Sequence, residues 1–482
     1  MSRQFSSAAL GVLLCAAALL ALVVGAASPV GAQAFDLIIA NGRVIDPESG
    51  LDAVRNVGIR GGKIVAISPD RLAGRTAIDA TGLVVAPGFI DLHAHGQTPE
   101  TYRFQALDGV TTSLELEVGT ADVEGWYAAR KNGRMINYGV SIGHIPVRMA
   151  VLHDPGTFLP SGDGAHRAAT AAEIAQIVQR LENGLKRGAV SMGAGLPYTE
   201  AATPHELSEV FRVAGRQRVP VHVHIRPGVA GLDEALKLAA QAHAPLHVVH
   251  INSAGAKATP EMLRMIEAAR RQGRDVTTEA YPYDAGMTEI RSAILDEYET
   301  APDERLAELE WPRTGELLTR QTFKKYRAMG GPVIRRTNTE AMVAVAINSP
   351  LTMIASDAYW DNGAGHPRTT GTFSRVLGRY VREAGSLKLM DAIRKMTLMP
   401  VRRLQARVPV MRSKGRLRVG ADADVTVFDP ASIIDRSTYR EPTLPPAGVR
   451  HVIVNGVPVV SNGQAVESVA PGRPIRAPIS LR

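Results

Sequence analysis

The chain has 482 residues, which is too long for one small domain and leaves room for a barrel of about 250 residues with an accessory domain. Apolar residues make up 45% and charged residues 21%, an ordinary globular composition that excludes global disorder. The formal net charge of +8 would suit nucleic-acid binding, but the basic residues are dispersed and no nucleic-acid-binding motif occurs. We therefore expect a basic soluble surface and no nucleic-acid partner.

Residues 1–34 have the features of a signal peptide. Arg3 supplies a positive start, residues 8–27 are almost wholly apolar, and "AQA" at 32–34 offers small residues for cleavage. We expect a periplasmic or secreted mature protein; an uncleaved leader would be its only membrane contact. Cys15, the single cysteine, lies in this segment. The mature chain would then contain no thiol, which suits an oxidising compartment and excludes cysteine as a metal ligand.

Two distant segments read as short strands joined by tight turns. Residues 35–86 contain "FDLIIANGRVID" and "VGIRGGKIVAIS", in which Asn-Gly and Gly-Gly mark turns. A similar pattern of short apolar runs and turn residues occurs within 411–482, in "ADVTVFDP" and "VRHVIVNGVPVVSNGQ". We expect a small β-sandwich domain built from both chain ends.

The middle of the chain, residues 87–410, predicts an α/β domain. Eight short apolar runs alternate with intervals that include helix-period segments. The clearest helix follows Thr170, which forms a capping box with Glu173 and precedes apolar residues along one face. Eight such units predict a (β/α)8, TIM-like barrel.

One interval is much longer than the others. Between the seventh and eighth predicted strands, residues 284–350 include a charged stretch that we expect to form helices over the barrel mouth. Two interpretations stay open: a lid or substrate wall, and plain helical decoration.

Ionisable side chains fall at the C-terminal ends of five predicted strands, where barrel enzymes place their active sites. In "IDLHAHG" the two histidines share one strand face, and the two glutamates of "LELEVG" do the same. The strand-end residues are His93, His95, Glu115, Glu117, His224, His250 and Asp357. His222 and His247 lie further back in their strands and are expected to be structural.

Imidazoles and carboxylates without a thiolate favour zinc, as one or two ions. The predicted ligands are His93, His95, Glu117, His224 and His250. Glu115 shares a face with Glu117 and is the alternative ligand from that strand. Asp357 is the predicted general base, which takes a proton from metal-activated water and delivers it to the leaving nitrogen.

The ordered motifs "PGFIDLHAH", "GVTT", "VHVHIR", "VVHIN" and "IASD" resemble the amidohydrolase superfamily, and within it the N-acyl-D-amino-acid deacylases (D-aminoacylases). The resemblance implies a distorted barrel with a β-sandwich, the ligands His93, His95, His224 and His250, and Asp357 as the acid/base. It also implies a substrate-binding set: Tyr283, Arg368, Arg226, Asn252, His144 and Arg148. For His144 and Arg148, a purely structural role is the alternative.

The chain departs from this family at two positions, and it differs from a related group at a third. The cysteine that the family usually offers on the second strand aligns with Val118, next to Glu117. The lysine often found two residues after the sixth-strand histidine is Asn252 here. The fourth strand, "AVSMGAG", has no lysine to carry the carbamate of dihydroorotases and hydantoinases.

We therefore expect a metal-dependent amidohydrolase that cleaves a linear C–N amide in a small molecule, such as an N-acyl (D-)amino acid. Two alternatives are a cyclic-amide hydrolase (dihydroorotase- or hydantoinase-like) and a deaminase on the same scaffold. A third is a catalytically silent binding protein. The sequence makes no prediction of oligomeric state.

Overall fold

The computed structural model describes residues 34–361 and 363–480. The predicted signal peptide lies, apart from Ala34, outside the described residues and stays a prediction. Within the described ranges, no helix combines the length and the apolar character needed to cross a membrane.

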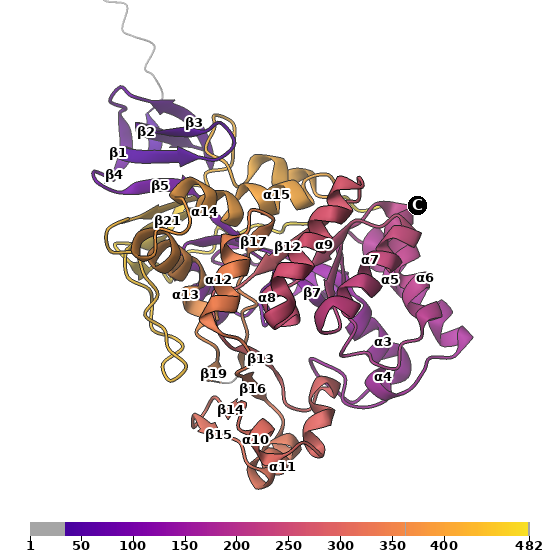
Figure 1. Cartoon of the computed structure of the whole chain (residues 1–482). Coiled ribbons are helices and arrows are strands. Elements are labelled where there is room, and N and C mark those ends of the chain that lie inside the picture. Colours follow the sequence, from indigo (N-terminus) through magenta and orange to yellow (C-terminus); the bar gives the residue numbers. More distant parts are fainter. Residues whose placement is uncertain (1–33, 362, 481–482) are drawn as a thin grey trace, which may run out of the picture.

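Eight parallel strands form the barrel wall in chain order, which confirms the predicted fold (Figure 1). The strands are β6 (Phe89–Asp91), β7 (Val110–Thr120), β8 (Asn137–Gly143), β9 (Met192–Gly195), β10 (Val221–His224), β11 (Leu246–Val248), β12 (Val276–Ala280) and β17 (Thr352–Ile354). Most of their residues are buried on both faces, as a parallel sheet covered by helices requires.

Side chains and backbone just beyond β17 and β6 bring the two ends of this sheet together. The Asp91 carboxylate accepts hydrogen bonds from the backbone N–H of His93 (3.1 Å) and of Ser356 (3.0 Å). Further along, Ala94 and Ala358 form a parallel bridge, and the His95 N–H donates to the Ala358 carbonyl at 2.7 Å. These bonds fix the first and last predicted ligand segments side by side.

Helices surround the barrel. They include α1 (Pro99–Leu107), α2 (Val123–Ala128), α3 (His144–Leu152), α5 (Ala171–Lys186), α6 (Pro204–Gln217), α7 (Gly228–Ala242), α9 (Thr259–Arg271), α12 (Glu340–Asn348), α13 (Arg368–Arg375), α14 (Leu389–Met396) and α15 (Leu398–Leu404). The predicted capping box begins α5: Thr170 accepts from the Glu173 N–H, and Glu173 accepts from the Thr170 N–H.

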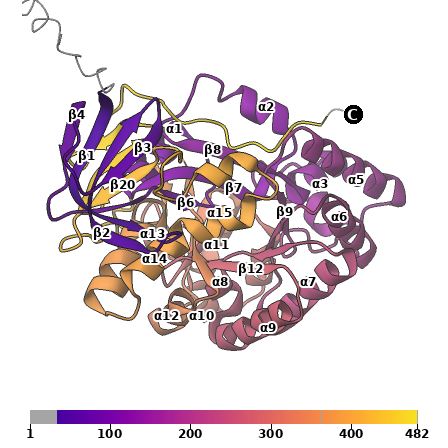
Figure 2. The ribbon, with the colours of Figure 1, turned by 90° about the horizontal axis from the view of Figure 1, so that it is seen from above.

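The accessory β domain joins the two chain ends, also as predicted (Figure 2). Its strands are β1 (Phe35–Asp46), β2 (Leu51–Arg60), β3 (Lys63–Ser68), β4 (Gly74–Asp79), β5 (Val84–Pro87), β20 (Val425–Phe428), β21 (Val449–Val454), β22 (Val457–Ser461) and β23 (Gln464–Ala465). They are hydrogen-bonded into one sheet of nine strands, in which β5 lies between β1 and β20. The chain leaves β5 and enters β6 one residue later, so the two domains are directly coupled.

The long interval after β12 forms a subdomain beside the barrel (Figure 1). It contains β13 (Gly286–Glu289), a 3₁₀ segment Ala293–Glu299, α10 (Asp303–Leu306), β14 (Leu309–Trp311), β15 (Glu316–Leu317), α11 (Arg320–Met329) and β16 (Pro332–Arg335). The prediction of helices alone is wrong, because β13, β16, β14 and β15 form an antiparallel sheet. Apolar runs of three or four residues do not distinguish a strand from a buried helix turn.

Candidate metal centre and active site

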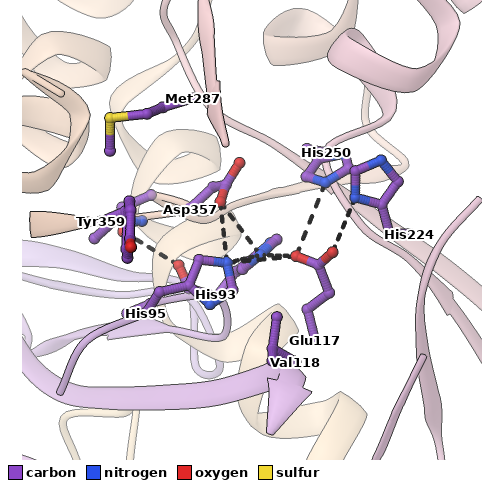
Figure 3. Close-up of polar contacts among 12 residues, drawn as sticks. His93, His95, Glu117, Val118, His224, His250, Met287, Asp357 and Tyr359 are labelled. Atoms are coloured by element: carbon purple, nitrogen blue, oxygen red, sulfur yellow. Dashed lines mark hydrogen bonds and ion pairs between the residues drawn. The ribbon is translucent and has the colours of Figure 1, made fainter. Parts of the chain in front are cut away.

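Five predicted ligands and the predicted base converge at the C-terminal end of the barrel (Figure 3). His93 and His95 follow β6, Glu117 lies in β7, His224 ends β10, His250 follows β11, and Asp357 follows β17. All are buried or nearly so. Two of them, His250 (φ 31°) and Asp357 (φ 52°), adopt the left-handed backbone conformation, which is uncommon outside glycine and concentrates at functional sites.

One group of donors consists of His93, His95, Glu117 and Asp357. The Nε2 atoms of His93 and His95 lie 3.1 Å apart. Glu117 Oε2 is 2.5 Å from His93 Nε2 and 3.4 Å from His95 Nε2. Asp357 Oδ1 is 3.4 Å and 3.3 Å from the same two nitrogens. All these atoms point to one position.

The second group consists of Glu117, His224 and His250. Glu117 Oε1 lies 2.9 Å from His224 Nδ1, and Glu117 Oε2 lies 4.0 Å from His250 Nε2. Glu117 is therefore common to both groups: its Oε2 faces His93, His95 and His250, and its Oε1 faces His224. This carboxylate lies where it can bridge two cations or complete the coordination of one.

Glu115, the alternative ligand from β7, is not in either group. Its carboxylate accepts from His95 Nδ1 at 2.7 Å and from the backbone N–H groups of Val118 and Gly119, each at 3.2 Å. A carboxylate on the outer nitrogen of a ligating histidine fixes the tautomer that leaves the inner nitrogen free to ligate. Glu115 therefore orients His95, and Glu117 faces the centre.

Glu279, in β12, does the same for His93, a role that the sequence pattern did not predict. Its Oε1 lies 2.6 Å from His93 Nδ1 and its Oε2 lies 3.1 Å from His247 Nε2. The signal was a glutamate within the buried run "TTEAY". His247 thus supports Glu279, and His222 packs on His247 with ring centroids 4.4 Å apart. Both histidines lie behind the donor groups, as expected of structural residues.

The charges of the centre are strongly coupled. Burial opposes protonation of His93, but the carboxylates of Asp357, Glu117 and Glu279 raise its pKa well above the usual value. Burial would raise the pKa of Asp357, yet Arg368 and His93 hold it below its ordinary range. Burial and the neighbouring His224 lower the pKa of His250 to about 3, so His250 is a neutral imidazole near neutral pH.

The donor set fits a divalent metal ion. Two inner imidazole nitrogens and two carboxylates approach the same position, and the buried Nδ1 of His250 has no hydrogen-bond partner. Without a cation the carboxylates would be costly to bury together. Imidazole nitrogen and carboxylate oxygen are ligands that zinc accepts, and outer carboxylates on two of the histidines complete the pattern of a zinc site.

Arg368 contacts the predicted base and does not line the cavity. Its Nη1 lies 2.8 Å from Asp357 Oδ2, and its guanidinium lies over the Tyr281 ring, 4.6 Å from the centroid. Arg368 is fully buried. The cavity wall includes Tyr281 and Asp357 but not Arg368. The guanidinium thus pairs with Asp357 Oδ2, while Oδ1 faces the donor groups.

Three other predicted substrate contacts also lie off the cavity wall. Tyr283 donates to Asp435 Oδ2 at 3.2 Å, Asn252 donates to the Tyr281 carbonyl at 3.2 Å, and Arg226 pairs with Glu234 at 2.6 Å. Each side chain has a protein partner that holds it in place. Their placement does not support direct contact with a substrate.

His144 and Arg148 form a separate buried cluster with Glu206. His144 Nε2 lies 2.8 Å from Glu206 Oε1, and Arg148 forms an ion pair with Glu206 Oε2 and a 2.8 Å hydrogen bond to the Gly164 carbonyl. Neither residue lines the cavity. Of the two roles left open by the sequence, the placement favours the structural one.

A cavity lies beside the donor groups and opens to solvent. Its floor includes His95, Glu117, His224, His250 and Asp357. One wall comes from the barrel loops and another from the subdomain after β12, through Met287, Thr288, Ile294 and Arg335. The long interval therefore forms part of the wall of the site, which favours the first of its two interpretations.

Comparison with known proteins identifies the family. Residues 84–459 match the Amidohydrolase family. An N-acyl-D-glutamate deacylase of Alcaligenes xylosoxydans xylosoxydans is 31% identical over 93% of this chain and 98% of that protein. A D-aminoacylase of the same organism is 30% identical over 89% and 95%.

A solved structure extends the likeness to three dimensions. The N-acyl-D-glutamate deacylase of Bordetella bronchiseptica, complexed with zinc and a phosphonate mimic of the tetrahedral intermediate, superposes with a TM-score of 0.79 at 29% identity. The match covers 92% of this chain and all of that one. The chain therefore belongs to the amidohydrolase family, among the N-acyl-D-amino-acid deacylases, and is a metal-dependent hydrolase of carbon–nitrogen bonds other than peptide bonds.

Proposed function

We propose that this enzyme hydrolyses the linear amide of an N-acyl-D-amino acid, releasing a carboxylic acid and the free amino acid. The observation that carries the proposal is the position of Glu117 between two histidine pairs, with the Asp357 carboxylate beside them at the cavity floor. The activities of the relatives supply the substrate class.

His93, His95, Glu117, His224 and His250 are proposed to hold zinc, as one or two ions. When bound by these residues, zinc would polarise the amide carbonyl and make a water molecule more acidic. Asp357 Oδ1 is the proton acceptor for that water, because it faces the donor groups while Oδ2 is held by Arg368. Arg368 keeps Asp357 ionised and ready to accept the proton. The same carboxyl then donates the proton to the leaving nitrogen.

The cyclic-amide alternative has less support. In β9 the residues Met192–Gly195 provide no lysine that a carbamate could use to bridge two ions. Glu117 supplies a carboxylate from β7 at the position between the histidine pairs. We also propose that residues 1–34 direct export, so that the reaction takes place in the periplasm or outside the cell.

The test is an assay of the purified, zinc-reconstituted protein with N-acetyl-D- and N-acetyl-L-amino acids beside hydantoin and dihydroorotate. We expect acetate release from D-substrates and bound zinc by elemental analysis. Hydrolysis of the cyclic amides alone would replace the proposal with the cyclic-amide alternative.

A further inference from the structure

A strongly basic segment begins within α15 and leads toward β20. Residues 402–418, "RRLQARVPVMRSKGRLR", contain six arginines and one lysine and no aspartate or glutamate. Two of these cations, Arg403 and Lys414, are buried and form ion pairs within the protein. The other five have no such structural explanation in common.

This segment closes the N-terminal end of the barrel, opposite the metal centre. Apolar side chains of α15 and of the residues after it pack in one cluster with the barrel-strand residues Ile90, Leu114 and Met353. Arg403 pairs at 2.5 Å with Asp275, the residue that precedes β12. Figure 1 shows α15 on the opposite side of the barrel from the subdomain that forms part of the cavity wall. A partner bound at this end would therefore leave the cavity opening free.

Three of the arginines line one pocket that opens to solvent beside the end of α15. Its wall consists of Glu48, Gln405, Ala406, Arg412, Arg416 and Arg418. Glu48 is the one carboxylate on this wall, and its Oε2 lies 3.1 Å from Arg416 Nε and 3.5 Å from Arg418 Nε. Arg412 is exposed and has no ion-pair partner in the described ranges. Three guanidinium groups against one carboxylate fit a bound phosphate, which arginine can bind through two hydrogen bonds at once.

Further exposed cations surround this pocket on the same end of the barrel. Arg402 lies in α15, and Arg218 and Arg274 shortly precede β10 and β12. Helix dipoles explain cations that follow the last turn of a helix, such as Arg218 and Arg274. They do not explain Arg416 and Arg418, which lie beyond the last helical turn of the segment and share a pocket wall.

Exposed apolar side chains accompany these arginines. Val410 is 40% exposed and Val419 is 63% exposed, the largest fraction among the described large hydrophobic residues. Arg418 Nη2 donates to the Arg412 carbonyl at 3.3 Å, so the two parts of the segment that carry the valines lie close together. Cations beside exposed apolar groups are typical of surfaces that lie on a lipid bilayer, where the apolar groups enter the headgroup region. Single-stranded nucleic acids instead stack on aromatic rings, and residues 402–419 contain none.

We propose that residues 402–419 form a docking site for the surface of an anionic phospholipid bilayer, and that the pocket of Arg412, Arg416 and Arg418 takes a lipid phosphate. The proposal replaces the expectation from the sequence that an uncleaved leader would be the only membrane contact. The metal centre faces away from the docked bilayer, so a soluble substrate still reaches the cavity. The proposal does not depend on which amide the enzyme hydrolyses.

The test measures sedimentation of the zinc-loaded protein with vesicles of phosphatidylcholine, alone or mixed with phosphatidylglycerol. We expect binding to the mixed vesicles at low salt, weak binding to phosphatidylcholine, and loss of binding as salt is raised. Arg412→Gln/Arg418→Gln should weaken binding roughly tenfold to thirtyfold, because each cation near an anionic surface contributes about fivefold. The matched control, Lys324→Gln/Lys325→Gln, removes two exposed charges from α11 in the subdomain and should leave binding within about twofold. All forms share one N-terminus, so differences among them do not come from residues 1–34.

A further pair of substitutions distinguishes a bilayer from a soluble polyanion. Val410→Ser/Val419→Ser should weaken vesicle binding by about threefold to tenfold and leave binding to heparin unchanged. Equal binding of the unaltered protein to both kinds of vesicle, equal losses in the arginine and lysine variants, or heparin binding without vesicle binding would overturn the proposal.

Activity on the vesicles tests the orientation. The kcat/KM for N-acetyl-D-leucine should agree within about twofold with and without mixed vesicles, because the cavity lies at the other end of the barrel. Loss of activity on vesicle binding would overturn the proposed orientation. Absence of hydrolysis of every N-acyl amino acid would instead overturn the proposed function and leave the vesicle results unchanged.

Discussion

Two buried clusters of histidine, carboxylate and arginine lie at strand ends of this barrel, and they have opposite designs. In the cluster after β8, His144 and Arg148 share the two oxygens of Glu206, and the arginine also binds backbone carbonyls. At the metal centre, the inner nitrogens of His93 and His95 face each other and two carboxylates.

The difference lies in what completes each cluster. Around Glu206, each carboxylate oxygen pairs with a nitrogen of His144 or Arg148, so the protein itself balances the charge of Glu206; His144 Nδ1 alone has no partner there. At the centre, outer carboxylates of Glu279 and Glu115 already occupy the Nδ1 atoms, and the inner nitrogens are left directed at one another. A buried polar cluster is a candidate metal site when several of its donor atoms point to one position and the protein itself supplies no partner there.

We expect the largest effect from a change of Asp357, the proposed general base. Asp357→Asn removes the group that accepts and donates the proton but keeps its size. We expect kcat to fall by about a thousandfold or more, toward the upper end of general acid–base contributions. Steady-state kinetics with N-acetyl-D-leucine and metal analysis of the same sample measure it.

Metal content is the control in that experiment, because Glu117, His224 and His250 are unchanged. Retained zinc with lost turnover assigns the effect to proton transfer. Full activity of Asp357→Asn would remove this residue from the mechanism, and loss of zinc would make it a ligand instead.

The second prediction concerns the cluster of His144, Arg148 and Glu206. Glu206→Gln keeps the shape of the side chain but leaves the buried Arg148 without its counter-charge. We expect the free energy of unfolding to fall by about 3 kcal/mol, the lower end of the cost of breaking a buried ion pair. Zinc content and kcat of the remaining folded protein should match the unaltered enzyme, as shown by denaturant unfolding and metal analysis. Loss of zinc in this variant would contradict the separation of the two clusters.

The sequence predicted the barrel and the convergence of its donors because strand periodicity is local. Two residues that share one face of a strand, such as His93 and His95, end on the same side of the sheet whatever the rest of the chain does. The order of eight strands then places five strand ends around one axis.

Contacts made between distant elements were not predictable in the same way. Glu279 of β12 contacts His93, which follows β6, and Arg335 lines the cavity from a sheet that was expected to be helical. Asp357–Arg368 pairing depends on the turn after β17, where Asp357 adopts a positive φ. These are consequences of tertiary packing, which no residue pattern along one segment encodes.

The smallest expected effect concerns Glu115, the carboxylate on the outer nitrogen of the ligand His95. Glu115→Gln keeps an oxygen that accepts from His95 Nδ1 but removes the negative charge that strengthens the ligand. Such outer partners typically contribute tenfold to a hundredfold in metal affinity. We expect a loss of about tenfold in zinc affinity, measured by competition with a chelator, and recovery of kcat at saturating zinc. Glu117→Gln differs in kind, because it changes an oxygen that faces both histidine pairs, and excess zinc should not restore its kcat. If both variants recovered equally, Glu117 would be an orienting residue like Glu115, and the centre would depend on its histidines alone.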